Sequence, residues 1–433
     1  MATSQPAGAA APAEPAEPAR RLWLAELLGG RLVDRAGERL GRVDDVIVRL
    51  GDGDLPPVTG LVGRIGGRQL FVPRDRIADV APGMVHLSGE TLNLLRFERR
   101  QGEVLLRQDV LDRRMIRVST GRLITARDIE LARNGAWHVA GVDVSPRGVL
   151  RRFLPVGMRS HSEQTRTFVE WQDVEPFVSH VPTSRLLMPL LRLRRLHPAQ
   201  IADIVEQASH EEGEEIISAV HADPELEAEV FEELDTEHQV EFLRDRSDED
   251  AAAVLDEMEA DDAADLITEL DQDRRLHVLS LMPAGKQAKV RALLGYNSDS
   301  AGGLMTTDFI AVSEDATVGQ AIAAVRTADV LEQVAAEVFV LDAEQRWCGS
   351  VPLVTLVQHG DDERVTALIE PGQPSLHPDD DFPEVALRMA DFNLTCAPVV
   401  DDDNHIIGAI TVDDVLEAML PDSWRRRAEA EGD

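Results

Sequence analysis

The sequence predicts a multidomain protein in which small all-β barrels are followed by an all-α superhelix of short helices and then by an α/β pair. Three patterns support this prediction: alternating apolar segments separated by turn residues in the first part, a twelve-residue helical period in the middle, and a gapless 59-residue repeat near the end. The chain has 433 residues, which is too long for one hydrophobic core and suits roughly three modules.

β structure is predicted for residues 21–182. Alternating segments such as RVDDVIVRL and VTGLVGRI are separated by turn sequences such as DRAG and IGG. A second, weaker copy follows, in which Asp128 matches Asp45 and Gly141 matches Gly60. We therefore predict two tandem small β-barrels. Paired arginines in this region are interpreted as solvated strand edges, with docking to an acidic partner as the alternative.

Helical structure is predicted for residues 197–296, where apolar residues recur every twelve positions. Twelve residues fit one two-turn helix and a corner, and N-cap residue types recur at the same period. We expect a superhelix in which the periodic side chains share one core. The two apolar series are Val230, Phe242, Val254, Leu266, Val278 and Val290, and Leu234, Arg246, Met258, Leu270, Met282 and Leu294. The residues in the cap phase are Asp223, Asp235, Ser247, Glu259, Asp271 and Pro283.

Negative charge dominates the chain and concentrates in the helical region. The formal net charge is −35, so nucleic acid and anionic lipid would be repelled. Between positions 200 and 275 there are 28 Asp or Glu, four Arg and no Lys. Such a surface repels itself unless cations condense on it. We expect its folding or docking to respond to divalent cations.

An α/β repeat is predicted near the end of the chain, with copies at residues 302–360 and 361–420. The segment VFVLDAEQRWCGSVPLVTLV aligns without gaps with the sequence 59 residues later, so that Gly349 matches Gly408. Each copy reads as strand, turn, strand and helix, preceded by an amphipathic helix. In this alignment the DDD run at 401–403 falls in the turn.

The remaining segments carry less information. Residues 1–20 are rich in Pro and Ala and are predicted to be disordered, and residues 421–433 form a tail. No stretch approaches the roughly 18 apolar residues that a membrane span needs. Cys348 and Cys396 lie in apolar, strand-like runs and are predicted to be buried free thiols in a reducing compartment. No nucleophile and base signature is present, so we do not expect an enzyme.

Three segments resemble known families. DRAGERLGRVDDVIV resembles the PRC-barrel family, whose members dock on protein partners. The unit that ends in GAITVDDVL is similar to cystathionine-β-synthase (CBS) domains, which occur in tandem pairs and usually dimerise. The linker NSDSAGGLMTTDFIAVSEDATVGQAIAAVR, between an acidic helical region and a CBS pair, resembles the MgtE-type magnesium transporters. This last resemblance covers residues 197–420, and the PRC-like part is not found in the usual transporter.

The resemblance to MgtE-type transporters implies a set of magnesium ligands. In that family the helical domain and the CBS pair form a sensor that closes a membrane pore when Mg²⁺ sits between their acidic surfaces. The positions that match are Asp261, Asp265 and Glu229 in the helical region, and Asp381, the backbone of Ala390, Asp414 and Glu417 in the second CBS unit.

Elementary chemistry agrees with this set. Asp261 and Asp265 are four residues apart and Asp414 and Glu417 three, so each pair projects from one face of a helix. Mg²⁺ prefers octahedral oxygen ligands and keeps several waters, so one or two carboxylates from each surface suffice. Two facing pairs would repel until a divalent ion bridges them, and the ion would then stabilise only the closed arrangement.

Departures from the family pattern occur in the second CBS unit. Pro383 stands where the family often has an acidic residue, with Glu384 displaced by one position, and Asn393 replaces an expected acidic residue. We expect a lower affinity for Mg²⁺ at one site at least.

A second ligand is an adenine nucleotide such as ATP or AMP. CBS pairs often bind it with Gly-x-x-[Thr/Ser]-x-x-Asp, and Gly408, Thr411 and Asp414 fit this pattern. The first unit has Pro352 and Thr355 at the last two places, so we expect at most one nucleotide site per chain.

The sequence therefore favours a cytoplasmic, magnesium-responsive regulatory protein that is a homodimer through its CBS domains. The PRC-like barrels would dock an unknown protein partner, for example a membrane channel. Without a membrane span, we do not expect the chain to act as a transporter by itself. Two alternatives stay open: an adenine-nucleotide sensor that uses the second CBS unit, and a ligand-free scaffold whose acidity serves solubility.

Overall fold

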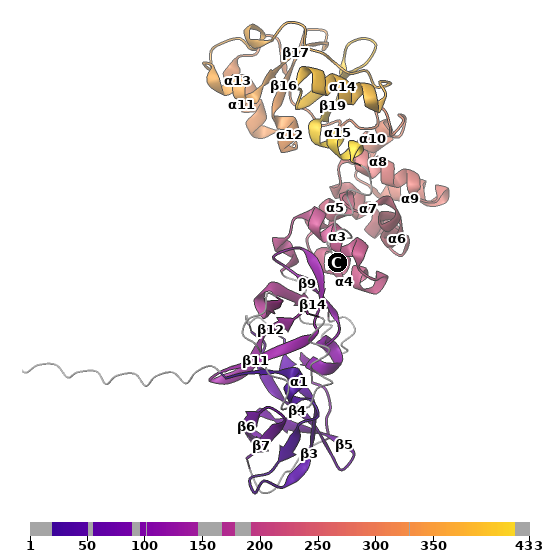
Figure 1. Cartoon of the computed structure of the whole chain (residues 1–433). Coiled ribbons are helices and arrows are strands. Elements are labelled where there is room, and N and C mark those ends of the chain that lie inside the picture. The colour runs from indigo at the N-terminus through magenta and orange to yellow at the C-terminus, as the bar shows by residue number, and fades with distance from the viewer. Residues whose placement is uncertain are drawn as a thin grey trace, which may run out of the picture. The chain divides into compact units, whose positions relative to one another are not determined.

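The computed structural model divides into two compact units, residues 1–220 and 221–433, which are described separately (Figure 1). The tails predicted at residues 1–20 and 421–433 lie outside the described residues, apart from Arg20. The described residues are 20–50, 55–88, 96–100, 102–145, 167–177, 192–328 and 330–420.

A seven-stranded sheet forms the first copy of the β region. Its strand order is β5-β4-β3-β2-β7-β6, and β8 pairs with β3. All pairs are antiparallel except β2 with β7. The strands are β2 (Arg31–Val33), β3 (Arg39–Arg49), β4 (Val58–Ile65), β5 (Arg68–Pro73), β6 (Ile77–Ala81), β7 (Met84–Leu87) and β8 (Glu103–Leu105).

Two smaller sheets form the second copy. One has the order β1-β11-β12-β13 and the other β10-β9-β14. The predicted β region is confirmed by these sheets. The strands are β1 (Arg20–Trp23), β9 (Arg114–Arg117), β10 (Arg122–Thr125), β11 (Asp128–Asn134), β12 (Ala136–Asp143), β13 (Phe168–Glu170) and β14 (Val174–Pro176).

The two copies exchange their leading segments. β1 precedes the first copy in the chain but pairs with β11 of the second copy, whereas β8 precedes the second copy and pairs with β3 of the first. Each strand runs into a helical turn, α1 (Leu24–Leu27) after β1 and the π-helical turn η2 (Leu106–Val110) after β8. Leu24 and Leu106 are both fully buried, in one core that spans the two copies. The copies therefore complete each other and form one folding unit.

Buried aspartates hold the exchanged segments in place by hydrogen bonds. The Asp45 carboxylate accepts the backbone N–H of Arg107 at 2.8 Å, and the Asp128 carboxylate accepts that of Ala25 at 3.1 Å. Each aspartate also accepts the N–H of the residue that follows it. Buried donors and acceptors need partners, so this pair of contacts explains why Asp recurs at the same place in both copies.

Glycine recurs for a steric reason. A Cβ at Gly60 would lie 2.7 Å from the ring of Phe71, and a Cβ at Gly141 would lie 2.5 Å from the ring of Phe168. In both copies a phenylalanine on the neighbouring strand thus lies over a glycine, and a larger residue would displace its ring.

Two helices follow the sheets in the first unit. α3 (Pro198–Gln207) and α4 (His210–Val220) pack on each other, and α3 also contacts β10. The Arg114 guanidinium joins both helices to the second copy, because it donates to the Gln207 carbonyl at 2.6 Å and pairs with Glu212 at 3.3 Å.

Six short helices open the second unit, and their first residues are spaced by twelve. α5 packs on α7 and α7 on α9, while α6 packs on α8 and α8 on α10, so alternate helices stack. The predicted twelve-residue period is confirmed, and the series that begins at Val230 is buried throughout. The helices are α5 (Pro224–Glu232), α6 (Thr236–Arg244), α7 (Asp248–Glu257), α8 (Ala260–Glu269), α9 (Gln272–Leu281) and α10 (Ala284–Leu293).

Only part of the predicted capping is seen. Asp235 and Ser247 accept the N–H of the residue three positions on, at 2.9 and 3.1 Å. Asp271 is an N-cap residue, but its side chain makes no cap hydrogen bond. In the second apolar series Arg246 replaces a hydrophobic residue and pairs with the buried Glu227 at 2.5 Å.

The α/β region follows, and its two copies repeat residue for residue. β16 and β18 begin 59 residues apart, as do β17 and β19, and α13 and α15. The two turns touch, because Trp347 and Asn404 exchange two hydrogen bonds of 2.8 Å, and residues 401–403 lie in the second turn, as predicted. The elements are β15 (Ala311–Ser313), α11 (Val318–Thr327), α12 (Glu332–Ala335), β16 (Glu337–Leu341), β17 (Trp347–Pro352), α13 (Leu353–Gln358), α14 (Phe382–Phe392), β18 (Cys396–Val400), β19 (Ile406–Thr411) and α15 (Val412–Met419).

The cysteines differ in their environment. Cys396 is a buried free thiol on β18, as predicted, whereas Cys348 is exposed on β17, so that prediction was wrong. The strand pattern that suggested burial does not say which face of a strand meets solvent. Among the described residues, no helix combines the length and the apolar character that crossing a membrane requires.

Glu337 should make the stability of the α/β region depend on pH. Burial raises its pKa from 4.5 to about 7. The folded state therefore binds the proton more tightly than the unfolded state, so stability falls as pH rises from about 4.5 to about 7 and then levels off. We compare the free energy of unfolding of Glu337→Gln with that of wild type. This difference should favour the variant by on the order of 2 kcal/mol more above pH 7 than at pH 4.5. Amide hydrogen exchange of β16 and β17 at both pH values measures this difference, and an equal difference at both would contradict the assignment.

Candidate metal centre

Carboxylates gather at the start of α8. Glu259 is the N-cap residue of the helix, and Asp261 and Asp262 lie in its first turn. The unpaired N–H groups at a helix N-terminus favour negative charge there. The backbone N–H of Glu259 donates to the Glu232 carboxylate of α5 at 2.6 Å, which adds a further carboxylate to the group.

A second set of carboxylates lies on α15 and is positioned by its capping. The Thr411 hydroxyl donates to Asp414 at 2.6 Å, and the Thr411 N–H donates to the same oxygen at 3.2 Å. This capping box fixes the Asp414 side chain at the helix start. Asp413 is next to it, and Glu417 lies on the following turn.

The two sets of carboxylates are coupled electrostatically. Burial, and then the charge of Asp414, raise the pKa of Asp261 to about 7. Burial and the charges of Asp261, Glu232 and Asp414 raise the pKa of Glu259 to about 8. Desolvation and neighbouring carboxylates also raise the pKa of Asp414, to about 6. We call this group the α8–α15 carboxylate cluster: Glu232, Glu259, Asp261, Asp262, Asp413, Asp414 and Glu417.

Asp262 completes the cluster. Asp262 is exposed, but desolvation in the crowded group and the charges of Asp261, Glu232, Glu259 and Glu417 raise its pKa well above the ordinary value. The charge of Glu417 thus acts on Asp262, as that of Asp414 acts on Asp261.

The chemistry of the cluster fits a divalent cation with oxygen ligands. One carboxylate oxygen of Asp261 is buried and has no hydrogen-bond partner. A buried acceptor without a partner is costly, and a cation or its water shell would satisfy it. Mg²⁺ takes oxygen ligands and needs only one or two carboxylates besides its waters. Asp261 and Asp414 would be the ligands from the two sides.

Lys286 supplies a positive charge at the edge of the cluster. Its ammonium donates to the Met258 carbonyl at the end of α7, next to Glu259, and its charge lowers the pKa of Glu232. Desolvation lowers the pKa of Lys286 itself. The chain has only one other lysine, Lys289, which pairs with Asp308 at 2.6 Å.

Two of the other predicted ligands lie near the cluster. Asp265 is exposed, and its pKa is raised by desolvation and then by Asp299 and Glu269. It lines a cavity of ≈ 240 Å³ together with Tyr296 and Gly303 of the linker. Glu229 is exposed on α5, where its charge acts on Glu232.

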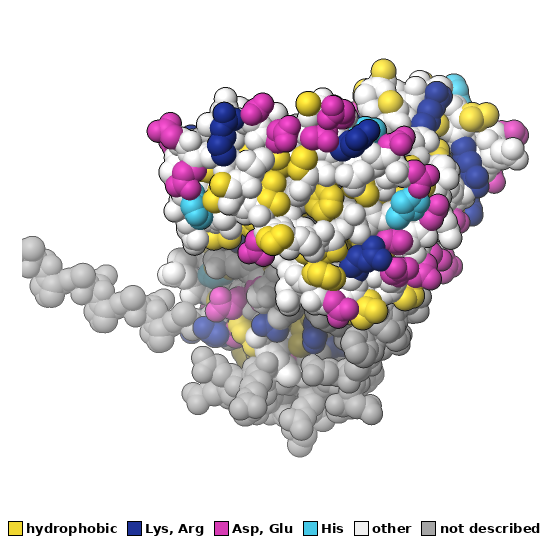
Figure 2. Space-filling model, turned by 90° about the horizontal axis from the view of Figure 1, so that it is seen from above, with side chains coloured by type: hydrophobic (Ala, Val, Ile, Leu, Met, Phe, Trp, Pro, Cys, Tyr) yellow, Lys and Arg dark blue, Asp and Glu magenta, His cyan; other side chains and the backbone are white. Residues whose placement is uncertain are grey.

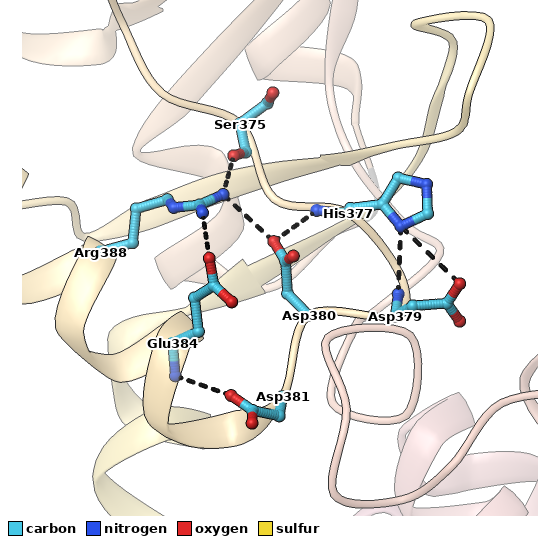
Figure 3. Close-up of polar contacts among 7 residues, drawn as sticks. All are labelled: Ser375, His377, Asp379, Asp380, Asp381, Glu384 and Arg388. Atoms are coloured by element: carbon cyan, nitrogen blue, oxygen red, sulfur yellow. Dashed lines mark hydrogen bonds and ion pairs between the residues drawn. The ribbon is translucent and has the colours of Figure 1, made fainter.

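Asp381 and Ala390 lie at opposite ends of α14 and are not brought together. Asp381 is the N-cap residue, and its carboxylate accepts the N–H of Glu384 at 3.2 Å (Figure 3). The Ala390 carbonyl accepts the N–H of Asn393 at the other end. Nine residues of helix separate them by roughly 13 Å, so one Mg²⁺ cannot bind both. Glu384 pairs with Arg388 at 2.6 Å, which already neutralises this displaced carboxylate.

The nucleotide pattern has an internal role in this structure. Thr411 is almost fully buried and bonds Asp414, so each of these polar groups already has a partner. A Cβ at Gly408 would lie 2.7 Å from the Met305 sulfur and 2.7 Å from the Thr306 carbonyl oxygen. Close packing against the linker therefore accounts for this glycine.

Sequence reasoning missed Glu232, Glu259, Asp262 and Asp413 as members of the cluster. Asp262 and Asp413 are the second residues of the DD pairs in DDAAD and VDDV, and this doubling was a usable signal. Glu232 and Glu259 sit at helix boundaries, and a hydrogen bond between residues 27 positions apart brings them together.

Comparison with known proteins identifies two domains. The family model of the MgtE intracellular N domain matches residues 196–299, and that of the CBS domain matches residues 365–421. This part of the chain is thus related to the cytosolic region of MgtE. The PRC-like resemblance of the first part stays a prediction.

The similar curated proteins are magnesium transporters MgtE. The chain is 35% identical to that of Thermus thermophilus over 139 residues, which is 32% of this chain and 31% of that protein. It is 29% identical to that of Enterococcus faecalis over 131 residues, 30% of this chain and 29% of that protein. The chain thus matches less than a third of the length of these relatives.

Among solved structures, the cytosolic domain of the Mg²⁺ channel MgtE in complex with ATP is 29% identical and covers 52% of this chain and 92% of its own, with a TM-score of 0.48. The soluble part of a magnesium transporter is 25% identical and covers 53% and 89%, with a TM-score of 0.47.

Lys286→Met should make the second unit depend more strongly on divalent ions. The substitution keeps the apolar stem but removes the charge beside Glu232, so repulsion in the cluster increases. We expect the Tm without divalent ions to fall by a few degrees and the rise on adding Mg²⁺ to exceed that of wild type. Lys289→Met is the matched control, since Lys289 pairs outside the cluster. Equal Mg²⁺ responses in the two variants would contradict a role for Lys286.

Proposed function

We propose that this protein is a magnesium-responsive regulatory protein in which Mg²⁺ bridges α8 of the helical region and α15 of the CBS region. The observation that carries the proposal is the buried, unpartnered carboxylate oxygen of Asp261, whose carboxyl group also feels the charge of Asp414. Homology of this region to the cytosolic region of MgtE supports the choice of Mg²⁺.

Linkage explains how such a site reports ion concentration. Without a cation, the facing carboxylates of α8 and α15 repel, and burial makes each charge more costly. A bound Mg²⁺ stabilises only the arrangement in which both helices contribute ligands, by RT ln(1 + [Mg²⁺]/Kd). The population of the closed arrangement therefore rises with Mg²⁺ concentration.

The other parts of the chain suggest how the response is used. We propose that the paired β copies at residues 21–182 dock a protein partner. Exposed apolar side chains on α13 and α15 support a homodimer through the CBS region: Val354 is 63% exposed, Val357 67% and Leu416 55%. Figure 2 shows hydrophobic side chains among the charged ones on the face that it presents.

Asp261→Asn combined with Asp414→Asn tests the ion bridge. For wild type we expect 10 mM MgCl₂ to raise the Tm of the second unit by a few degrees, as about 1.4 kcal/mol would for a Kd of about 1 mM. The double variant should have a higher Tm without divalent ions, because two repelling charges are gone, and should lose most of the Mg²⁺ response. Differential scanning calorimetry at constant ionic strength measures both effects.

Asp402→Asn with Asp403→Asn is the control for charge, since these carboxylates lie in the β18–β19 turn. It should keep the full Mg²⁺ response. A wild-type Tm that is unchanged by Mg²⁺, or a double variant that responds like wild type, would exclude the bridge.

Val354→Asp with Val357→Asp tests the dimer. A charge on the exposed apolar face of α13 should prevent its burial, so light scattering should report half the wild-type mass. Leu276→Asp is the control, because Leu276 is equally exposed at 71% but lies on α9. Wild-type protein that is monomeric at 100 µM would contradict the proposal.

A further inference from the structure

An open pocket lies on the outer face of the sheet β1-β11-β12-β13, in the second copy of the β region. Its volume is ≈ 300 Å³. Side chains at alternate positions along each strand line it, among them Arg21, Glu130, His138, Ala140, Phe168 and Glu170. Residues two apart on a strand share one face, so the pocket belongs to this face of the sheet.

The equivalent face of the first copy is covered by the chain itself. Ile47 and Phe71 of that face pack against Phe97, which reaches them from residues 96–100. The Phe97 N–H donates to the Gln69 carbonyl of β5 at 3.2 Å, so the covering segment follows the edge of the sheet. The Arg100 guanidinium lies 4.6 Å from the centre of the Phe71 ring.

The register of the two sheets shows which residues correspond. Ile47 pairs with Gly60, and Glu130 pairs with Gly141, so Glu130 replaces Ile47. Phe168 lies over Gly141 as Phe71 lies over Gly60. The open face thus keeps the aromatic ring of the covered one and gains a carboxylate.

Acidic groups give the open face its chemistry. The Glu130 side chain is only 7% exposed, and its partner is Arg21, at 3.2 Å, whose own side chain is 59% exposed. Glu170 pairs with Gly141 as Pro73 pairs with Gly60, so Glu170 takes the place of Pro73 in the second copy. Glu170 is exposed. A cation that approaches this face therefore meets the exposed carboxylate of Glu170, with the ion pair of Glu130 and Arg21 and an aromatic ring beside it.

We propose that this face binds an extended segment of a partner protein that carries an aromatic residue and an arginine. The inference rests on the proposed docking role of the β region and names its surface. The partner's backbone would add along the edge strand β13, as residues 96–100 follow β5. Its aromatic side chain would contact Phe168, and its arginine would bind Glu130 and Glu170.

The carboxylates of the face favour a basic partner over a second copy. Glu170 is exposed and Glu130 lies on the same face, so two copies of this face would bring carboxylates together, whereas an arginine of a partner would offset them. The segment that covers the first copy has the sequence RFERR at residues 96–100, which shows the side-chain types that this kind of face accepts.

A fluorescein-labelled peptide RFERRQG, added to the full-length chain, tests the proposal by anisotropy. Saturable binding is expected for wild type, and Ala140→Arg, which fills the pocket, should weaken it about tenfold. Thr120→Arg adds the same charge at an exposed turn of the second copy and should change the affinity less than twofold. Glu170→Gln should weaken the binding of RFERRQG about threefold. It should not weaken the binding of a control peptide in which Gln replaces each Arg.

Three outcomes would overturn the proposal. The first is that wild type shows no saturable binding up to 1 mM peptide, and the second is that Ala140→Arg binds the peptide as well as wild type does. The third is that wild type self-associates and Ala140→Arg abolishes this, because a second copy would then be the occupant. The Mg²⁺ response of Ala140→Arg is measured in parallel. If it equals that of wild type while peptide binding is absent, the docking face alone is refuted and the ion sensor stands.

Discussion

Repulsion between the carboxylates of α8 and α15 is the constraint on which the second unit depends. One oxygen of Asp261 is buried, the charge of Asp414 raises the pKa of this residue, and four other carboxylates act on Glu259. In a chain without bound ions, the free energy cost of this repulsion must be offset by packing elsewhere in the unit. The periodic core of the helical region provides that packing, since Val254 and Leu266 are almost fully buried beneath the charged helix starts. A cation at the cluster would remove the repulsion without changing this core.

The local structure around the cluster explains why its geometry is defined. Helix starts recur every twelve residues, and a hydrogen bond from the Glu259 N–H to Glu232 ties the start of α8 to α5. The capping box at Thr411 holds Asp414 in one orientation. Lys286 offsets charge only on the side of Glu232. The repulsion between Asp261 and Asp414 therefore remains uncompensated by Lys286.

Periodicity made much of the fold predictable from the sequence. The twelve-residue and 59-residue repeats gave the helices and the α/β copies because burial imposes those spacings on side chains. Asp261 and Asp414 were predicted from a resemblance, and the structure places them in one cluster. Glu232 and Glu259 could not be predicted, because a long-range hydrogen bond between them, and not spacing along one helix, brings them together. Asp381 and Ala390 share a helix, and only its length shows that they cannot share an ion.

The exchange of β1 and β8 has a consequence for the two β copies. Each copy supplies the strand that completes the other, and Leu24 and Leu106 are buried in one common core, so neither copy can unfold alone. A face that served only stability would be covered in both copies, as Phe97 covers the first. In the second copy, none of the described residues takes the place of Phe97, and Trp23 and Phe168 lie half-buried in edge-to-face contact, with ring centres 6.3 Å apart, beside a nearly buried carboxylate. Folding alone does not require half-buried aromatic rings beside a desolvated charge, so this face is better explained by a ligand.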